Sequence, residues 1–426
     1  MKFTKMSLVA ALLIGSSAFA IENTKVTGDV NLYYMTGDAS SGTSSGTLFN
    51  ADQSAADMSL NLNITTDLFK NDMVAISAGA GMTALTTLGA EQVLVDYVWG
   101  GAHGITGNTS GRGAHVDTPV WMNEAWLAVT TGKTTAKLGR MTLDTPLAFT
   151  ETWTIEKNTF EAAVLINQDI PDTTLIAAYV GNGNGTENLH GTPTTNLPQG
   201  PVSAAAVVNQ GGEFDTYGQS GAYAVAVINN SFEPLTVQAW YYAVKDVANA
   251  YWLQADLNID GILAGLQYTD VAPVASGTKS DNVYAMMLGY GMKDTFTAKL
   301  AYSQTNDDGT IGYSGFNTAT SVGSAQSKLY TEAWNNHGQI TQSDTSAINL
   351  TVESPVNGMV DLGLYVTMID HGSNATNANT KPLEATLTAG KSFGPLDVTA
   401  AYIYYDVDQS GVSASNTIQA YLTVNF

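Results

Sequence analysis

An alternation of apolar and polar side chains constrains this chain more than any other feature, because it recurs in short runs along almost the whole sequence. In the run 25–36, Val30 and Leu32 fall on one face, while Asp29 and Asn31 fall on the other. A period of two predicts half-buried β-strands and not helices. We predict eighteen strands, at residues 25–36, 57–66, 73–83, 121–131, 136–141, 159–167, 173–180, 221–229, 235–244, 251–259, 262–269, 282–290, 295–304, 346–353, 359–369, 383–391, 396–406 and 416–426.

The connections between these runs alternate in length. Short turns such as Asp260-Gly261, a strong hairpin signal, alternate with longer polar segments, above all those at about 85–120, 181–220 and 305–345. Short periplasmic turns and long extracellular loops are typical of an outer-membrane β-barrel with an even number of strands. The sequence therefore predicts an all-β fold, a transmembrane antiparallel barrel of about eighteen strands.

A soluble β-sandwich also alternates apolar and polar side chains, so the absence of charge on the apolar face is what distinguishes a membrane barrel from it. The faces that carry Val237, Leu253 and Leu364 hold no charge, while the opposite faces carry polar residues such as Gln238 and Asp256. Lys or Arg on the lipid face near mid-membrane costs about 2–4 kcal/mol, whereas polar residues suit a wet lumen. Aromatic residues cluster near strand ends, at 33–34, 240–242, 251–252 and 402–405. We expect these clusters to form girdles at the membrane interfaces. The alternative is that they only reflect the preference of aromatic residues for β-strands.

Composition excludes several classes of function. Only 13% of residues are charged and the formal net charge is −22, so the basic patches that nucleic acid requires are absent. The chain has no Cys, which excludes disulfides, a zinc thiolate site and a Cys nucleophile. We find no nucleophile beside a base, no metal-ligand spacing and no phosphate loop, and we expect the five histidines to lie in surface loops. The sequence predicts a protein that is not an enzyme and has no cofactor or metal.

The two ends of the chain carry export and assembly signals. Residues 1–20 combine Lys2 and Lys5 with the short apolar run Met6–Ile14 and a small-residue cleavage site, which predicts a cleaved secretory signal peptide. Residues 21–426 show no linker, so we expect one barrel domain in the outer membrane of a Gram-negative bacterium. We expect the strand 416–426 to pair with 25–36, because a barrel leaves no edge in lipid. Its alternating aromatic end is the expected signal to the barrel assembly machinery, carried by Tyr421, Leu422, Val424 and Phe426.

The stretch 136–167 reads as a strand, a polar loop at 142–158 and a second strand. Three of its motifs resemble the OprD-like family of Gram-negative outer-membrane porins: Ala136-Lys137-Leu138-Gly139-Arg140, Asp144-Thr145-Pro146-Leu147 and Asn158-Thr159-Phe160-Glu161. The resemblance implies an eighteen-stranded barrel whose third outer loop, here 142–158, folds into the pore. Members of the family often carry an Arg near 153–157 as part of a basic ladder that guides acidic solutes. This chain has only Glu156 and Lys157 there, so we do not carry over uptake of carboxylates or basic amino acids.

The charged residues of this stretch are the candidate constriction: Asp144, Glu151, Glu156, Lys157, Lys137 and Arg140. Arg140 shares a strand face with Leu138, so a bulge would be needed to turn it inward.

These features predict a porin, a water-filled channel for passive diffusion of ions and small hydrophilic solutes that is weakly cation-selective. We expect a homotrimer in contact with outer-membrane lipid and lipopolysaccharide. One alternative is a structural or adhesive barrel that acts through its long extracellular loops. The other is a secreted soluble β-protein.

Overall fold

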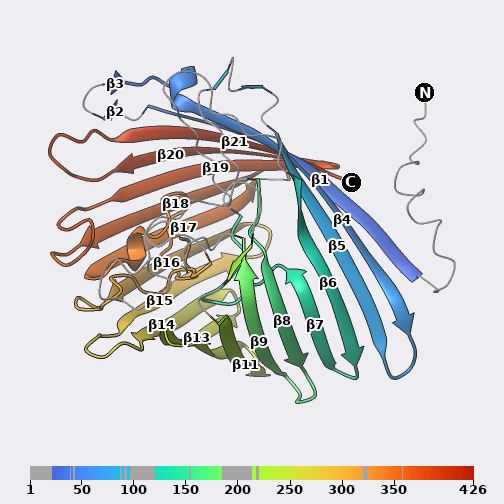
Figure 1. Ribbon diagram of the computed structural model, residues 1–426. Coiled ribbons are helices and arrows are strands. Elements are labelled where there is room, and N and C mark those ends of the chain that lie inside the picture. Colours follow the sequence, from blue (N-terminus) through green and yellow to red (C-terminus); the bar gives the residue numbers. More distant parts are fainter. Residues whose placement is uncertain are drawn as a thin grey trace, which may run out of the picture.

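Eighteen long antiparallel strands close into a barrel in the computed structural model (Figure 1). The structure describes residues 22–38, 40–41, 44–86, 89–90, 94–95, 120–152, 155–184, 214–216, 220–319, 325–356 and 358–426. The predicted signal peptide and most of the loops predicted at 85–120 and 181–220 lie outside these residues. No helix among the described residues is long and apolar enough to cross a membrane. Within the described ranges, two short 3-10 helices are present, at Ala51–Gln53 and Gln339–Thr341.

All eighteen predicted strands are confirmed, with ends within four residues of the predictions. The barrel strands are β1 (Glu22–Gly37), β4 (Ser54–Lys70), β5 (Ala75–Thr86), β6 (Val120–Thr131), β7 (Thr134–Met141), β8 (Phe160–Asn167), β9 (Thr173–Gly183), β11 (Ala222–Phe232), β12 (Leu235–Val244), β13 (Ala248–Ile259), β14 (Ile262–Pro273), β15 (Asp281–Met292), β16 (Phe296–Thr305), β17 (Thr345–Val356), β18 (Val360–His371), β19 (Leu383–Phe393), β20 (Leu396–Asp406) and β21 (Ser415–Asn425). In the described parts of the connections lie three two-residue strands: β2 (Ser40–Ser41), β3 (Ser44–Ser45) and β10 (Asp215–Thr216).

The barrel closes where β1 pairs with both β4 and β21. In the β1–β21 pair, Val30 lies opposite Val424 and Leu32 opposite Leu422. Gly28 and Phe426 complete the seam by exchanging two backbone hydrogen bonds of 2.9 Å. The predicted partnership of 25–36 with 416–426 is therefore confirmed, and the sheet has no open edge in this region.

Connections at the two ends of the barrel differ in length, as predicted. At one end β13 and β14 are joined by Asp260-Gly261, whose φ angles of 50° and 86° are both positive, as a type I′ hairpin turn requires. At the other end lie the long segments, including 142–159 and 306–344. One connection at that end is short, since only Lys245–Val247 separate β12 from β13.

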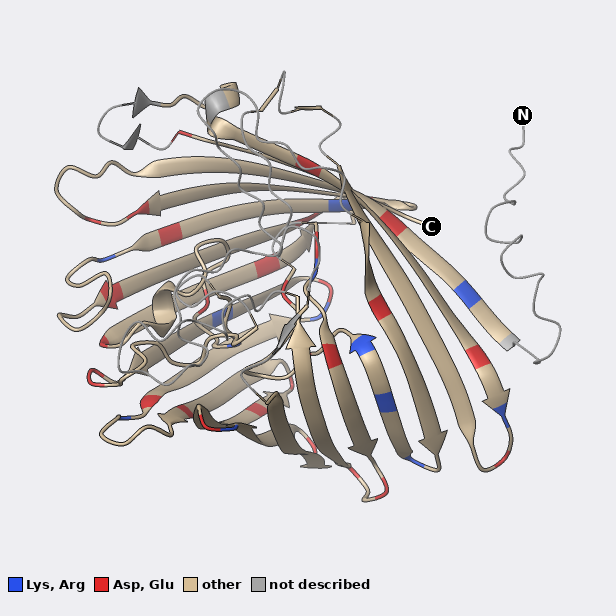
Figure 2. Ribbon diagram, viewed as in Figure 1, with Lys and Arg blue, Asp and Glu red and all other residues tan. Residues whose placement is uncertain are grey.

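The two faces of the strands have opposite chemistry. Val237 and Leu253 on the outer face are 38% and 47% exposed, whereas Trp252 and Gln267 on the inner face are 0% and 4% exposed. Figure 2 shows that Lys and Arg are sparse along the strands and that several lie at turns. The assignment of an apolar outer face and a polar inner face, made from alternation, agrees with these exposures.

The aromatic clusters do not all form outer girdles, because neighbouring residues of a strand point to opposite faces. Trp240, Tyr242 and Trp252 are buried on the inner face, and Tyr33 is only 1% exposed. The outer face does carry tyrosines that contact one another across strands. These pairs, with their ring-centroid distances, are Tyr179–Tyr223 at 5.1 Å, Tyr251–Tyr268 at 6.0 Å and Tyr284–Tyr302 at 6.3 Å.

Candidate functional site

The 142–158 segment, which leaves β7 and returns to β8, is folded and largely buried. Isolated antiparallel bridges join Asp144 to Phe149 and Thr152 to Lys157, so the main chain makes two small hairpins. Leu147 and Ile155 within it are only 2% and 5% exposed. A loop lying in solvent would not bury apolar side chains to this extent.

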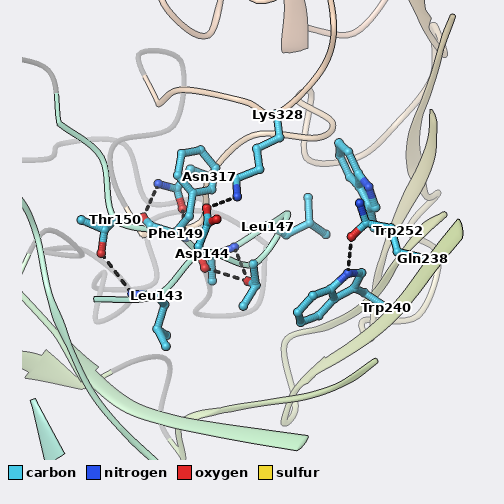
Figure 3. Close-up of polar contacts among 12 residues, drawn as sticks. Leu143, Asp144, Leu147, Phe149, Thr150, Gln238, Trp240, Trp252, Asn317 and Lys328 are labelled. Carbon is cyan, nitrogen blue, oxygen red and sulfur yellow. Dashed lines mark hydrogen bonds and ion pairs between the residues drawn. The ribbon is translucent and has the colours of Figure 1, made fainter. Parts of the chain in front are cut away.

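One end of this segment contacts the inner face of β12 and β13. The backbone nitrogen of Leu147 lies 3.4 Å from the hydroxyl of Tyr242, and the Leu147 side chain belongs to a buried apolar cluster that includes Trp240 and Trp252. Figure 3 shows Leu147 pointing toward these two indoles. Gln238 and Gln254 accept hydrogen bonds of 2.8 and 2.9 Å from the Trp240 and Trp252 Nε1 atoms, which satisfies the polar edges of the rings.

The other end contacts a different part of the wall. Ile155 packs in a cluster with Tyr33 of β1, Leu85 of β5 and Trp121 of β6. In the order of the eighteen long strands around the barrel, β1 is first and β12 is ninth. The segment therefore touches inner walls that are eight strands apart, close to half of the circumference.

A second segment, 306–344 between β16 and β17, is tied to the first. Asn317 donates from Nδ2 to the Phe149 carbonyl and to Glu151 Oε1, both at 2.8 Å, and its Oδ1 accepts from the Phe149 nitrogen at 3.0 Å. Thr318 donates from its backbone nitrogen to the Leu147 carbonyl at 2.9 Å. These bonds join residues more than 160 positions apart and satisfy the backbone of the first segment.

The 306–344 segment also contacts inner-face residues of several strands. The Tyr330 hydroxyl donates to Asp256 Oδ1 at 2.5 Å, and Gln267 Nε2 donates to the Lys328 carbonyl at 2.8 Å. Sequence reasoning treated this region as a polar outer loop and missed these residues. Its aromatic residues, among them Phe316, Tyr330 and Trp334, were the available signal, because an outer loop has no need of them.

Asp144 and Lys328 form an ion pair where the two segments meet (Figure 3). The Asp144 side chain is 91% exposed and that of Lys328 is 30% exposed. The Lys328 ammonium also lies 4.9 Å from the centroid of the Phe149 ring. Of the predicted acidic residues of the loop, Asp144 is the one that faces solvent.

Glu151 is fully buried and is hydrogen-bonded to the 306–344 segment. Its Oε1 accepts hydrogen bonds from Asn317 Nδ2 at 2.8 Å and from the Gln326 nitrogen at 2.9 Å. These contacts join the two segments, so this carboxylate serves packing and is not presented to solutes.

Glu156 is 2% exposed, and its Oε1 atom has no hydrogen-bond partner. Burial raises the pKa of Glu156 to about 8, and the nearby Asp29 carboxylate adds to the rise. The side chains of Ser59 and Asn61 and the charge of Lys157 act in the opposite direction. Glu156 is therefore mostly protonated at pH 7, against the expectation that it would carry charge.

The predicted basic residues lie in three different places. Lys157 is exposed on the 142–158 segment. Lys137 lies on the inner face of β7, with its ammonium 4.1 Å from the centroid of the Trp126 ring. Arg140 shares the outer face with Leu138, because the regular register of β7 with β6 and β8 leaves no bulge in that strand.

Arg140 is held on that face by local contacts. Its Nε atom lies 2.8 Å from Glu161 Oε1, and its guanidinium lies 4.1 Å from the centroid of the Phe214 ring. The register shifts in this region fall in neighbouring strand pairs, between β5 and β6 at Gly81 and Met82 and between β8 and β9 at Glu161 and Ala162. Arg140, predicted as part of the constriction, therefore lies on the outer face of β7.

The residues predicted to form the assembly signal divide between the faces of β21. Val424 and Phe426 are 41% and 58% exposed, and Leu422 lies opposite Leu32 on the same face. Tyr421 points inward, with its ring 4.9 Å from that of Tyr33.

The histidines differ from the expectation of surface positions where the structure describes them. His371 is the final residue of β18 and is 1% exposed, and burial lowers the pKa of His337 to about 4. His103, His115 and His190 lie outside the described residues. Among described residues, no group of three or more His, Cys, Asp or Glu side chains could hold a metal ion.

Solved structures with this architecture include three that cover nearly all of the chain. OccK3 (OpdO) of Pseudomonas aeruginosa has a TM-score of 0.69 at 10% identity and covers 95% of this chain and 96% of its own. OccAB2 of Acinetobacter baumannii has a TM-score of 0.70 at 15% identity and covers 95% and 98%. Pseudomonas aeruginosa OpdK, solved with vanillate, has a TM-score of 0.66 at 11% identity and covers 96% and 99%.

No protein-family model and no curated protein sequence matches the chain. The likeness is therefore one of structure, and at these identities it shows the fold. These neighbours are OprD-family porins, so the resemblance drawn from the 136–167 stretch is confirmed at the level of the fold: this chain has the eighteen-stranded barrel of the OprD-like porins.

Proposed function

We propose that this protein is an outer-membrane porin, a water-filled channel through which ions and small hydrophilic solutes diffuse passively. The observation that carries the proposal is the pair of segments, 142–158 and 306–344, that pack against inner-face residues and meet at the exposed Asp144–Lys328 pair. In a barrel with a fully packed interior, we would not expect exposed charged side chains such as Asp144 at that junction. We propose that the 142–158 segment narrows the lumen there.

The inner wall at the turn end of the barrel supports this proposal. A cavity of about 990 Å³ lies there, and polar and charged side chains dominate its lining, including Lys299, Glu353, Asp361, Tyr365 and Asp397. A lining of this kind holds water and hydrated solutes, whereas a packed core would exclude such side chains. The turn end therefore suits a vestibule on the periplasmic side.

The location and partners belong to the same proposal. The apolar outer face and its tyrosine pairs suit lipid and lipopolysaccharide of a Gram-negative outer membrane, reached after cleavage of a signal peptide at 1–20 and insertion by the barrel assembly machinery. A homotrimer is proposed as well. The adhesive alternative is not favoured, because Lys328 and Tyr330 of the 306–344 segment contact inner-face residues of the barrel.

We also propose weak cation selectivity, which we now attribute to Asp144 alone and not to Asp144, Glu151 and Glu156 together. Glu151 is buried and Glu156 is mostly neutral, so Asp144 is the acidic residue of the loop that acts on passing ions. A lone unit charge about 5 Å away in water is worth about 0.8 kcal/mol, or about a fourfold preference, and the paired Lys328 ammonium offsets part of this effect. Screening over a Debye length of about 8 Å weakens this preference at physiological salt.

Planar-bilayer recording of the purified protein tests the channel. The proposal expects discrete conductance steps in KCl from protein that shows heat-modifiable gel mobility. A folded barrel without conductance would contradict the porin and leave the structural alternative.

The zero-current potential under a KCl gradient tests the selectivity. At low salt and pH 7, Asp144→Asn should reduce cation preference by about fourfold or less, while the matched variant Glu156→Gln should leave it unchanged. An unchanged potential in Asp144→Asn would remove this residue from the pathway.

A further inference from the structure

A second cavity lies beside the junction of the two segments. It has a volume of about 490 Å³ and is lined by Tyr33, Met35, Thr152, Gln326, Trp334, Asn335, Asn336, His337, Gln419 and Tyr421. The 142–158 segment contributes Thr152, the 306–344 segment contributes the residues from Gln326 to His337, and β1 and β21 supply the wall. We call it the aromatic–amide cavity. Its volume falls within the range of about 300–1,000 Å³ that small-molecule sites occupy.

Among the residues that the structure describes, the lining of this cavity carries no Lys, Arg, Asp or Glu. Its titratable ring, His337, is neutral at pH 7 because burial lowers its pKa to about 4. Carboxylates lie behind the lining. Glu384 accepts hydrogen bonds from the nitrogens of Asn335 and Asn336 at 2.9 and 2.8 Å and from Asn336 Nδ2 at 2.7 Å, and Glu151 accepts one from the Gln326 nitrogen at 2.9 Å. A charged solute would lose hydration here without direct contact with an opposite charge on the described lining.

Aromatic rings and amides make up most of what remains. The Tyr33 and Tyr421 rings lie 4.9 Å apart, and Trp334 is held 6.4 Å from Tyr365. Trp334 and Tyr421 are both partly exposed.

The amides are positioned by their neighbours. Gln419 Nε2 donates to Asn335 Oδ1 at 2.8 Å, and the Tyr421 hydroxyl donates to Gln419 Oε1 at 2.8 Å. An amide has two donor hydrogens and an oxygen with two lone pairs, so these contacts leave capacity for a ligand. The cavity thus offers fixed flat apolar faces beside donors and acceptors of no net charge.

We propose that the aromatic–amide cavity is a subsite for neutral saccharides, from one to two rings in size. A pyranose presents a flat patch of C–H groups that packs on an aromatic face, while its hydroxyls exchange hydrogen bonds with amides. This inference rests on the proposed porin function and gives it a substrate class. Because Thr152 belongs to the segment that narrows the lumen, a sugar bound here obstructs the ion path.

Ion current through the full-length protein in a planar bilayer tests the subsite. The probes are maltose and glucose, with glucuronate and glucosamine as rings of similar size that carry charge. The expected result is a saturable fall in KCl conductance with the neutral sugars and a weaker effect with the charged ones. Trp334→Ala and the near-isosteric Gln419→Leu should each raise the half-saturating maltose concentration by about fivefold.

A control variant at the other end of the barrel is Thr388→Ala, which lines the vestibule and should leave the maltose titration unchanged. Open channels without a saturable sugar effect, or with equal effects in all variants, would overturn the subsite and leave the porin intact. Equal inhibition by glucuronate would overturn the neutral specificity. Folded protein with no conductance would overturn the porin and the subsite together.

Discussion

At the residue scale, burial separates the acidic side chains of the 142–158 segment. Sequence placed Asp144, Glu151 and Glu156 together, and the structure separates them into an exposed acid, a buried hydrogen-bond acceptor and a mostly protonated acid. No local pattern distinguishes these three, because their environments come from Asn317, Ser59 and other distant residues. The residue types of the site could be predicted, and their protonation and exposure could not.

Glu156 gives a pH-dependent prediction. Its pKa rises from the ordinary value of 4.5 to about 8 in the folded protein, so the native state holds this proton more firmly than the unfolded chain. Stability should therefore be highest below pH 4.5 and fall as pH rises toward 8, by an amount on the order of a few kcal/mol. Glu156→Gln should remove this part of the pH dependence and raise the free energy of unfolding at pH 8. Urea unfolding of both proteins in lipid vesicles at pH 5 and pH 8 makes the comparison, and parallel pH profiles would show that Glu156 is not buried as described.

Neighbouring residues of β12 test the assignment of the faces. Val237→Arg places a charge on the outer face and should lower the free energy of unfolding in lipid by about 2–4 kcal/mol. Thr236→Arg points inward, where Asp256 lies opposite it in the β12–β13 register, and should cost much less. Equal losses in the two variants, measured by urea titration in vesicles, would contradict the assigned inside and outside.

At the scale of elements, the strands were predictable and the inner segments were not. Each barrel strand has one face toward the outside and one toward the inside along its whole length. The alternation of apolar and polar residues within the strand itself therefore predicts it. The 306–344 segment has no such period, and its position depends on single contacts such as Tyr330 with Asp256 and Asn317 with Glu151. Apart from its aromatic residues, the sequence of this segment therefore gives no signal that it packs against the inner wall.

The closing seam gives a prediction with a matched control in the same strand. A Cβ atom added at Gly28 would lie 2.5 Å from the Asn61 carbonyl oxygen and from the Phe426 ring, so the backbone or the ring would have to move. Gly28→Ala should destabilise the barrel by about 1–3 kcal/mol and reduce the fraction with heat-modifiable mobility. Gly37→Ala, whose nearest contact would be an ordinary 3.5 Å to Thr417 Oγ1, should have little effect. Equal behaviour of the two variants would contradict the packing of Phe426 on β1.

At the scale of the molecule, different observations support the barrel fold and the proposed solute pathway. The closed barrel follows from strand pairing and agrees with solved porins over about 95% of the chain. The pathway rests on the 142–158 segment, which contacts inner walls eight strands apart and exposes Asp144 at its junction with 306–344. The central claim is that solutes pass this junction.

Thiol modification tests that claim most directly, because the chain has no Cys and a single introduced thiol can be labelled alone. Asp144→Cys is compared with Val412→Cys, an exposed position in the connection between β20 and β21. A bulky charged thiol reagent added to open channels in a planar bilayer should lower the conductance of Asp144→Cys in steps that a reductant reverses, and should leave that of Val412→Cys unchanged. Unaltered conductance of Asp144→Cys, with complete labelling shown by mass spectrometry, would mean that solutes do not pass this junction.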